Sequence, residues 1–277
     1  MTNTNDLILV LGGTGKTGRR VAARLTERGA PVRLGSRAAN PKFDWDDQDT
    51  WSAAVDGVTA AYVSYSPDVA FPGAAETVAA FADLAVERGV RHLVLLSGRG
   101  EEGAERAEQA VQESGAAWTI VRSSFFMQNF SEDFLVDAVR AGVVAFPGGR
   151  VAEPFIDLED LADVAAAALT EPRHEKQLYE VTGPAMLTFS EAVAVIGDAV
   201  GREVVYVPIT PDEYAEGAIA EGMAADFAYE LTDLFATVLD GRNAHLSDGV
   251  QRALGREPRG FVEFARRLAA TGVWSAQ

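Results

Sequence analysis

Several glycines follow the first apolar run of the chain at a spacing that suits phosphate binding. The run Leu7–Leu11 ends in Gly12, and the pattern continues as Gly12-x-x-Gly15-x-x-Gly18, also readable as Gly13-x-Gly15-x-x-Gly18. A strand that leads through glycines into a helix offers backbone N–H groups and the positive end of the helix to a pyrophosphate. The segment therefore predicts a dinucleotide site. Its candidate binding residues are Gly12, Thr14, Gly15, Lys16, Thr17 and Gly18.

The residues about twenty positions further on favour NADP over NAD. Sites for NAD usually carry an acid there, which accepts the ribose 2′-hydroxyl, whereas NADP requires a cation for its 2′-phosphate. No acid lies between Glu27 and Asp44, and Ser36-Arg37 follows an expected strand. An arginine can bind a phosphate through two parallel N–H bonds, and a serine hydroxyl can add a third. We therefore expect NADPH as the cofactor, with Ser36 and Arg37 at its 2′-phosphate.

This part of the chain is also strongly basic. Residues 16–40 contain seven Lys and Arg against Glu27 alone, in a chain whose remainder is acidic. The arginines of the expected helix after the glycines could attract the anionic cofactor, or they could form a solvated helix face. The sequence leaves both interpretations open.

The elements that must position these residues alternate between strand and helix. Segments at 7–11, 31–34, 58–63, 93–96 and 118–121 predict strands, several of them apolar throughout, as in strands buried on both faces of a parallel sheet. Helical spacing of apolar residues predicts helices over 17–28, 74–88 and up to about residue 114. The expected fold class is α/β, a Rossmann-type doubly wound parallel sheet with right-handed crossovers.

The pattern changes after about residue 173. Short segments at 178–181 and 204–207 predict two more strands, and the remainder to Trp274 is mostly helical. We therefore expect two domains, an NADP-binding Rossmann domain over 1–177 and a smaller, mostly helical substrate-binding or lid region over 178–277.

The composition excludes several classes of function. The 277 residues include no cysteine, which rules out disulfide scaffolds, zinc ribbons, iron–sulfur sites and thiol catalysis, and three scattered histidines predict no metal site. A net charge of −17 disfavours nucleic acid as a partner. The longest uncharged run, residues 57–67, is far shorter than the roughly 20 residues that span a bilayer, and the polar start lacks a secretory pattern. We expect a cytoplasmic protein that binds no membrane.

Five segments of the sequence form a recognisable set. They lie at residues 12–18, 42–45, 95–97, 122–130 and 154–162, the last two reading RSSFFMQNF and PFIDLEDLA. Together they resemble the NmrA-like branch of atypical short-chain dehydrogenase/reductases, over residues 7–183. The resemblance is nearest to reductases of secondary metabolism, namely ergot-alkaloid iminium reductases and antibiotic-pathway ketoreductases such as that of simocyclinone biosynthesis.

The resemblance implies which residues surround the cofactor. It places Asp44 and Trp45 beside the adenine, Ser64 and Tyr65 beside the ribose, and the segment after Arg122 beside the nicotinamide. The apolar and amide side chains of that segment suit a flat organic substrate, but its aromatic rings would equally suit a core, and its amides could tie down their own loop. Its candidate substrate-binding residues are Phe125, Phe126, Gln128 and Asn129.

The tyrosine and lysine that protonate the substrate in ordinary short-chain dehydrogenases are absent. None of the six tyrosines is followed by a lysine four residues later, and none of the three lysines lies on the expected helix after Ser97. That helix carries acids instead, at Glu101, Glu102, Glu105 and Glu108. Ser97 ends an expected strand, where ligands bind in open α/β sheets. We assign Ser97 as the catalytic group that polarises a carbonyl, with Gly98 beside it at the substrate, and a helix-capping serine is the alternative.

Two functions from different classes fit this pattern. The first is an NADPH-dependent ketoreductase that transfers hydride to a carbonyl of a polycyclic aromatic, polyketide-type secondary metabolite. Because a positioned general acid contributes about 10² to 10⁴ in rate, such an enzyme could take its proton from the substrate or from water. An iminium or quinone reductase is a variant of this function. The second is a non-catalytic NADP-binding regulator that senses redox state, and it would bind the cofactor without consuming it.

Overall fold

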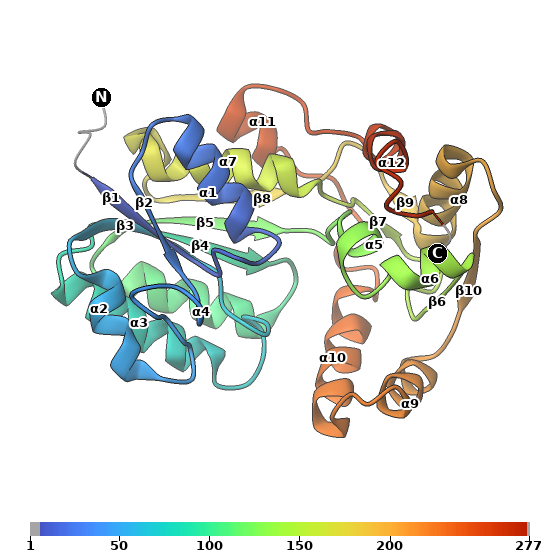
Figure 1. Ribbon diagram of the computed structural model, residues 1–277, viewed down its shortest axis with the longest axis horizontal. Coiled ribbons are helices and arrows are strands. Elements are labelled where there is room, and N and C mark those ends of the chain that lie inside the picture. The colour runs from blue at the N-terminus through green and yellow to red at the C-terminus, as the bar shows by residue number, and fades with distance from the viewer. Residues whose placement is uncertain (1–5, 276–277) are drawn as a thin grey trace. The chain divides into compact units, whose positions relative to one another are not determined.

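Six parallel strands form the main sheet of the structure, a computed structural model that describes residues 6–275 (Figure 1). Their order is β2-β1-β3-β4-β5-β8, and each neighbouring pair is parallel. The chain adds strands on both sides of β1, as in a doubly wound Rossmann-type sheet, so the expected fold class is confirmed. The strands are β1 (Leu7–Leu11), β2 (Val32–Gly35), β3 (Val58–Val63), β4 (His92–Gly98), β5 (Ala117–Ser123) and β8 (Gln177–Val181).

Helices cover both faces of this sheet. Figure 1 shows α1, α7 and α11 on one face and α2, α3 and α4 on the other. Parallel strands need such crossover helices, which is why strand and helix alternate along the sequence. No helix within residues 6–275 has the length and apolar character needed to cross a membrane. The bounds are α1 (Gly18–Glu27), α2 (Trp51–Val55), α3 (Ala74–Glu87), α4 (Glu102–Glu113), α7 (Leu158–Thr170) and α11 (Gly249–Leu254), with 3₁₀ turns at Gln48–Thr50 and Pro172–His174.

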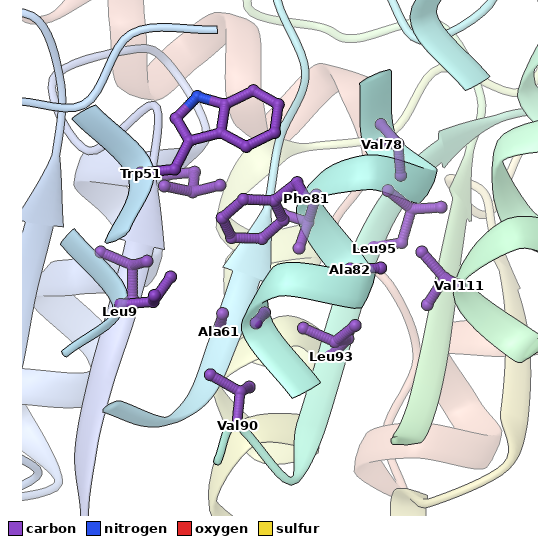
Figure 2. Close-up of a cluster of buried hydrophobic side chains, with 14 of the residues drawn as sticks. Leu9, Trp51, Ala61, Val78, Phe81, Ala82, Val90, Leu93, Leu95 and Val111 are labelled. Atoms are coloured by element: carbon purple, nitrogen blue, oxygen red, sulfur yellow. The ribbon is translucent and has the colours of Figure 1, made fainter. Parts of the chain in front are cut away.

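A hydrophobic core fixes the sheet against α3 and α4 (Figure 2). Val78 and Phe81 of α3 and Val111 of α4 are fully buried, as is Leu93 of β4. Trp51 of α2 extends this core, with its ring 5.8 Å from that of Phe81. Burying each such side chain stabilises the fold by about 1.5–3 kcal/mol. This packing holds β1, β3 and β4 in register, and with them the loops at their carboxyl ends.

The described chain forms two compact units. Each unit consists of three separate segments, which alternate along the sequence with those of the other unit. The first unit holds the main sheet and comprises residues 6–123, 158–181 and 248–256. The second comprises residues 124–157, 182–247 and 257–275.

The sequence assigned the strand at 178–181 to the C-terminal region, and this is wrong. β8 pairs with β5 along the main sheet, with Tyr179 opposite Val121, and it is covered by α11. Tyr179 and Val181 are buried there, which explains why the strand joins the sheet rather than the tail. The single boundary expected after residue 177 therefore differs from the interleaved division. The binding roles assigned to the two regions stay predictions.

An aromatic core organises the second unit. Phe146, Phe155 and Phe189 are fully buried, and the Phe189 ring lies 4.9 Å from Phe146 and 5.2 Å from Phe155. Two small sheets surround this core within the described residues, one pairing β6 with β10 in parallel and one pairing β7 with β9 antiparallel. The elements are α5 (Asn129–Glu132), α6 (Val136–Ala141), β6 (Val143–Phe146), β7 (Ala152–Glu153), β9 (Leu187–Thr188), α8 (Phe189–Val200), β10 (Val205–Pro208), α9 (Pro211–Ala220), α10 (Ala225–Val238) and α12 (Phe261–Ala269).

Candidate functional site

The glycine segment forms a tight turn between β1 and α1. Gly12 has a φ of +63°, which favours glycine, and its carbonyl oxygen accepts a hydrogen bond of 2.8 Å from the Gly15 N–H. A Cβ on Gly18 would overlap the Gly12 carbonyl group. Thr14 and Gly15 are exposed at the tip of the turn, and the first turn of α1 carries no acidic side chain. The turn therefore leaves room and a positive helix end for a phosphate group. Lys16 is half-buried and Thr17 is buried.

The residues that the resemblance placed beside adenine and ribose gather next to this turn. Ser64 follows β3, and its side chain lies 3.6 Å from the position that a Cβ on Gly12 would take. The Trp45 indole N–H donates to the Ser64 carbonyl oxygen at 3.1 Å, and the Trp45 and Tyr65 rings lie 5.0 Å apart. These side chains therefore meet at the carboxyl ends of β1 and β3, where the strand order reverses and where open α/β sheets bind ligands.

Asp44 is fixed in the same place by its neighbours. The Lys42 Nζ lies 3.1 Å from Asp44 Oδ2, and this hydrogen bond lowers the pKa of the Asp44 carboxyl. The Trp51 indole N–H donates to the Asp44 carbonyl oxygen at 2.7 Å. Asp44 therefore stays ionised at neutral pH, with its carboxylate available to accept hydrogen bonds.

Arg37 is not bound to an acid within residues 6–275 as Arg20 and Arg24 of α1 are, although its charge helps to lower the pKa of the Asp44 carboxyl. Arg20 and Arg24 are bound to acids of α7, with Arg20 Nε 2.8 Å from Glu159 Oε1 and Arg24 Nε 2.7 Å from Asp163 Oδ1. Arg37 is exposed just beyond β2 and makes no hydrogen bond or ion pair to any residue between 6 and 275. The α1 arginines are therefore engaged in packing α1 on α7, and Arg37 is the cation that a 2′-phosphate could use, with half-buried Ser36 next to it.

Ser97 is buried, and its hydroxyl has a partner on α4. Its Oγ donates to Glu108 Oε1 at 2.5 Å, and the same oxygen accepts from Arg122 Nε at 2.9 Å. The hydroxyl proton is therefore directed at a carboxylate within the protein. This geometry favours a positioning role for Ser97, and the predicted polarisation of a substrate carbonyl stays a prediction.

A carboxyl group without a role predicted from the sequence lies beside Gly98. The Glu101 carboxylate occupies the place that a Cβ on Gly98 would take, so glycine is the residue that fits there. Burial chiefly raises the pKa of Glu101, to about 8; Asp68 and Glu108 add to the shift and Arg122 opposes it. The sequence contains no signal that distinguishes Glu101, because this residue precedes α4 in extended conformation and lies outside the helical periodicity of Glu102, Glu105 and Glu108.

The segment expected at the substrate belongs to the second unit. Gln128 is buried, and its Nε2 donates to Asp157 Oδ1 at 2.6 Å, while Asp157 Oδ2 lies 2.7 Å from Arg267 Nη2. The Phe125 ring is half-buried and lies 5.3 Å from that of Phe189 in the aromatic core. Gln128 thus ties down its loop and Phe125 packs on the core, which were the alternatives to substrate binding.

Phe126 and Asn129 lie in the same loop. Phe126 forms a β-bridge with Ile156 and is half-buried, whereas Asn129 is buried and begins α5. Because Ser97 and Gly98 lie in the first unit, the structure divides the predicted substrate residues between both units. Substrate binding by these residues remains a prediction.

Comparison with known proteins gives consistent results over nearly the whole length. The model of the NmrA-like family matches residues 4–264, well beyond the last motif in the sequence. An NAD(P)H azoreductase from Xenophilus azovorans is 35% identical, over 95% of this chain and 98% of its own. An agroclavine dehydrogenase from Claviceps fusiformis is 32% identical, over 93% of this chain and 95% of its own.

A solved structure supports the fold. The crystal structure of an NADPH-dependent quinone oxidoreductase from Escherichia coli, complexed with NADPH, superposes with a TM-score of 0.77 at 20% identity. The superposition covers 94% of this chain and 99% of that one.

Proposed function

Because this chain belongs to the NmrA-like family, we propose that it is an NADPH-dependent reductase of small organic molecules. The observation that carries the proposal is the glycine turn together with Arg37. Gly12 and Gly18 let the turn close tightly against the N-terminus of α1, because a Cβ on Gly18 would overlap the Gly12 carbonyl group. Arg37 offers an exposed guanidinium beyond β2 that makes no hydrogen bond or ion pair within the described residues. Together they suit a dinucleotide that carries a 2′-phosphate.

The chain's own residues fit the cofactor in three places. The turn at Gly12 and Gly15 would hold the pyrophosphate, Ser36 and Arg37 the 2′-phosphate, and Trp45 with its neighbouring side chains the adenosine. The predicted contacts of Thr14, Lys16, Thr17, Asp44, Ser64 and Tyr65 belong to the same proposal. When bound, NADPH supplies a hydride, and the protein supplies orientation and electrostatics.

The relatives support the reductase class. One is named an azoreductase and another a dehydrogenase of the alkaloid agroclavine, and a structural neighbour is named a quinone oxidoreductase. All three names describe oxidoreductases that act on small organic molecules. We propose an aromatic carbonyl compound or quinone as substrate, within which a polyketide-type ketone of antibiotic biosynthesis is the narrower choice and an iminium compound the further alternative.

A regulator that binds NADP without turnover is the second candidate. The observation that favours it is that the Ser97 hydroxyl donates its proton to Glu108 and is therefore not directed at a substrate. The chain also lacks the tyrosine–lysine pair of ordinary short-chain dehydrogenases. Absence of nucleic-acid binding and a cytoplasmic location remain predictions from composition.

Two measurements on the purified protein test the proposal. Calorimetric titration with NADPH and NADH should give tighter binding of NADPH. Absorbance decay of NADPH, with a panel of quinones, hydroxy-anthraquinones and cyclic iminium compounds, should then reveal turnover of at least one member. NADPH binding without any turnover would favour the regulator, and failure to bind NADPH would overturn both candidates.

A further inference from the structure

The carboxyl group of Glu101 is held at the carboxyl edge of the main sheet. Glu101 immediately precedes α4, and its side chain folds back over Gly98, the last residue of β4. Within residues 6–275 this carboxyl makes no hydrogen bond to another group. Its position is therefore set by packing against the strand end, and its acidic proton has no acceptor inside the described chain.

The charged groups around Glu101 are mostly acids. Asp68, in the loop after β3, is one of these acids. Its carboxylate accepts a hydrogen bond from the Ala70 N–H at 2.9 Å, and burial raises the pKa of this carboxyl. Glu108 of α4 is also near. Arg122 of β5 is the nearby cation, but its Nε and Nη2 both bind Glu108, and its Nη1 lies 3.7 Å from Glu105. Glu101 thus faces two acids, Asp68 and Glu108, and a cation, Arg122, that is already bound to Glu108.

This environment keeps Glu101 protonated at neutral pH. Burial disfavours the ionised form, and the nearby negative charges add to the effect, so the pKa rises to about 8. The described residues contain no group of three or more His, Cys, Asp or Glu side chains that could hold a metal ion. A protonated carboxyl group is an O–H donor, which an ordinary ionised glutamate is not.

The position of Glu101 matters because ligands bind outside the carboxyl ends of strands in such sheets. The glycine turn lies after β1, Ser64 after β3 and Glu101 after β4, in three successive positions of the strand order. The chain lacks the usual tyrosine donor, and the Ser97 hydroxyl already donates to Glu108. Glu101 is thus the acid at this edge whose proton is uncommitted.

We propose that Glu101 is the proton donor of the reduction, a role that rests on the proposed function. As a hydride from NADPH adds to the carbonyl carbon, the Glu101 O–H bond breaks and a new O–H bond forms at the carbonyl oxygen. The carbonyl compound is reduced to an alcohol, which in the case of a quinone tautomerises to the hydroquinone, while NADPH is oxidised to NADP⁺ and Glu101 is left as a carboxylate. Water returns the proton to Glu101 before the next turnover.

The first test needs no turnover. Infrared titration of the free protein follows the stretch of protonated carboxyl groups in the wild type, in Glu101→Gln and in Glu102→Gln. Glu102 is the control because it adjoins Glu101 but is 90% exposed and pairs with Arg106. The wild type minus Glu101→Gln difference should show one protonated carboxyl at pH 7, lost with a midpoint near pH 8, and Glu102→Gln should match the wild type. A difference spectrum without a protonated carboxyl at pH 7 overturns the proposal, whether or not the variant is less stable.

The second test is the pH dependence of turnover with 1,4-naphthoquinone as acceptor. The wild-type kcat should fall as the pH rises through 8, because Glu101 loses its proton. Glu101→Gln should lower kcat by about 10², the lower end of the usual effect of a general acid, and should flatten this pH limb. Titration with NADPH should give equal affinity for both proteins. Turnover by Glu101→Gln with the wild-type rate and pH profile overturns the role of Glu101 alone, whereas absence of NADPH binding to the wild type overturns the proposed function itself.

Discussion

The carbonyl group of Gly12 occupies the space in which a Cβ on Gly18 would lie. The close approach of these two residues brings the first turn of α1 against the end of β1. Because the helix N-terminus and the turn together make the proposed phosphate site, this contact links the packing of α1 to cofactor binding.

Gly18→Ala should therefore impair both the packing of α1 and the binding of NADPH. The added methyl group must displace α1 from the turn, which we expect to destabilise the protein by about 1–3 kcal/mol and to weaken NADPH binding at least tenfold. Urea denaturation and calorimetry measure the two effects. Gly217→Ala is the control, since Gly217 lies exposed in α9 with open space around it, and a helical alanine there should be neutral or stabilising by up to about 1 kcal/mol. Equal NADPH affinity in both variants would contradict the proposed phosphate site.

Arg37→Ala should change the choice of cofactor. Loss of a charge-assisted contact to the 2′-phosphate costs about 1.5–3 kcal/mol, so we expect about 10- to 100-fold weaker NADPH binding and unchanged NADH binding. Because Arg37 binds no described residue, stability should not change. Arg106→Ala, which removes an exposed arginine of α4, is the control for net charge. A parallel loss of NADH affinity would indicate that Arg37 contacts a different part of the cofactor.

Glu101 should make stability depend on pH. Its pKa is raised in the folded state, so the folded protein binds a proton more tightly than the unfolded chain, and this contribution to stability is complete below the unfolded pKa and lost as the pH rises through about 8. Glu101→Gln removes that dependence. In urea denaturation, the free energy of unfolding of the variant minus that of the wild type should therefore increase as the pH is raised from 5 to 9. A difference that stays constant over this range would show that Glu101 titrates as an ordinary glutamate.

Ser97→Ala should affect stability more than catalysis. The substitution leaves Glu108 with one donor fewer in a buried place, which we expect to cost about 1 kcal/mol in the free energy of unfolding. Because the hydroxyl faces Glu108, kcat/KM should fall by less than about tenfold. A loss of about 100-fold at unchanged stability would instead support the catalytic role predicted from the sequence.

The strands of the main sheet could be predicted where the signal was local. Those at 7–11, 58–63, 93–96 and 118–121 agree with β1, β3, β4 and β5 to within two residues, because continuous apolar runs identify strands buried on both faces. β8 was assigned to the wrong region because its partner, β5, is distant in sequence. The interleaved units depend on such distant contacts, which no local periodicity contains.

In the candidate site, too, local features could be predicted from the sequence and contacts between distant residues could not. The turn at Gly12 could be predicted because its conformation depends on a few consecutive residues. The partner of Ser97 depends on how α4 is rotated against the sheet, which turns Glu108 inward and Glu102 outward. The four glutamates in and just before α4 look alike in sequence, and burial in the folded protein distinguishes them.

The interleaving of the two units limits how the gene can be divided. The chain changes unit at residues 123/124, 157/158, 181/182, 247/248 and 256/257, so no continuous fragment encodes either unit complete. A fragment that ends at residue 123 would lack α7, α11 and β8, so that α1 alone would cover that face of the sheet and β5 would become an edge strand. A single recombination event therefore cannot exchange one whole unit of this chain for that of another protein and leave the other unit intact.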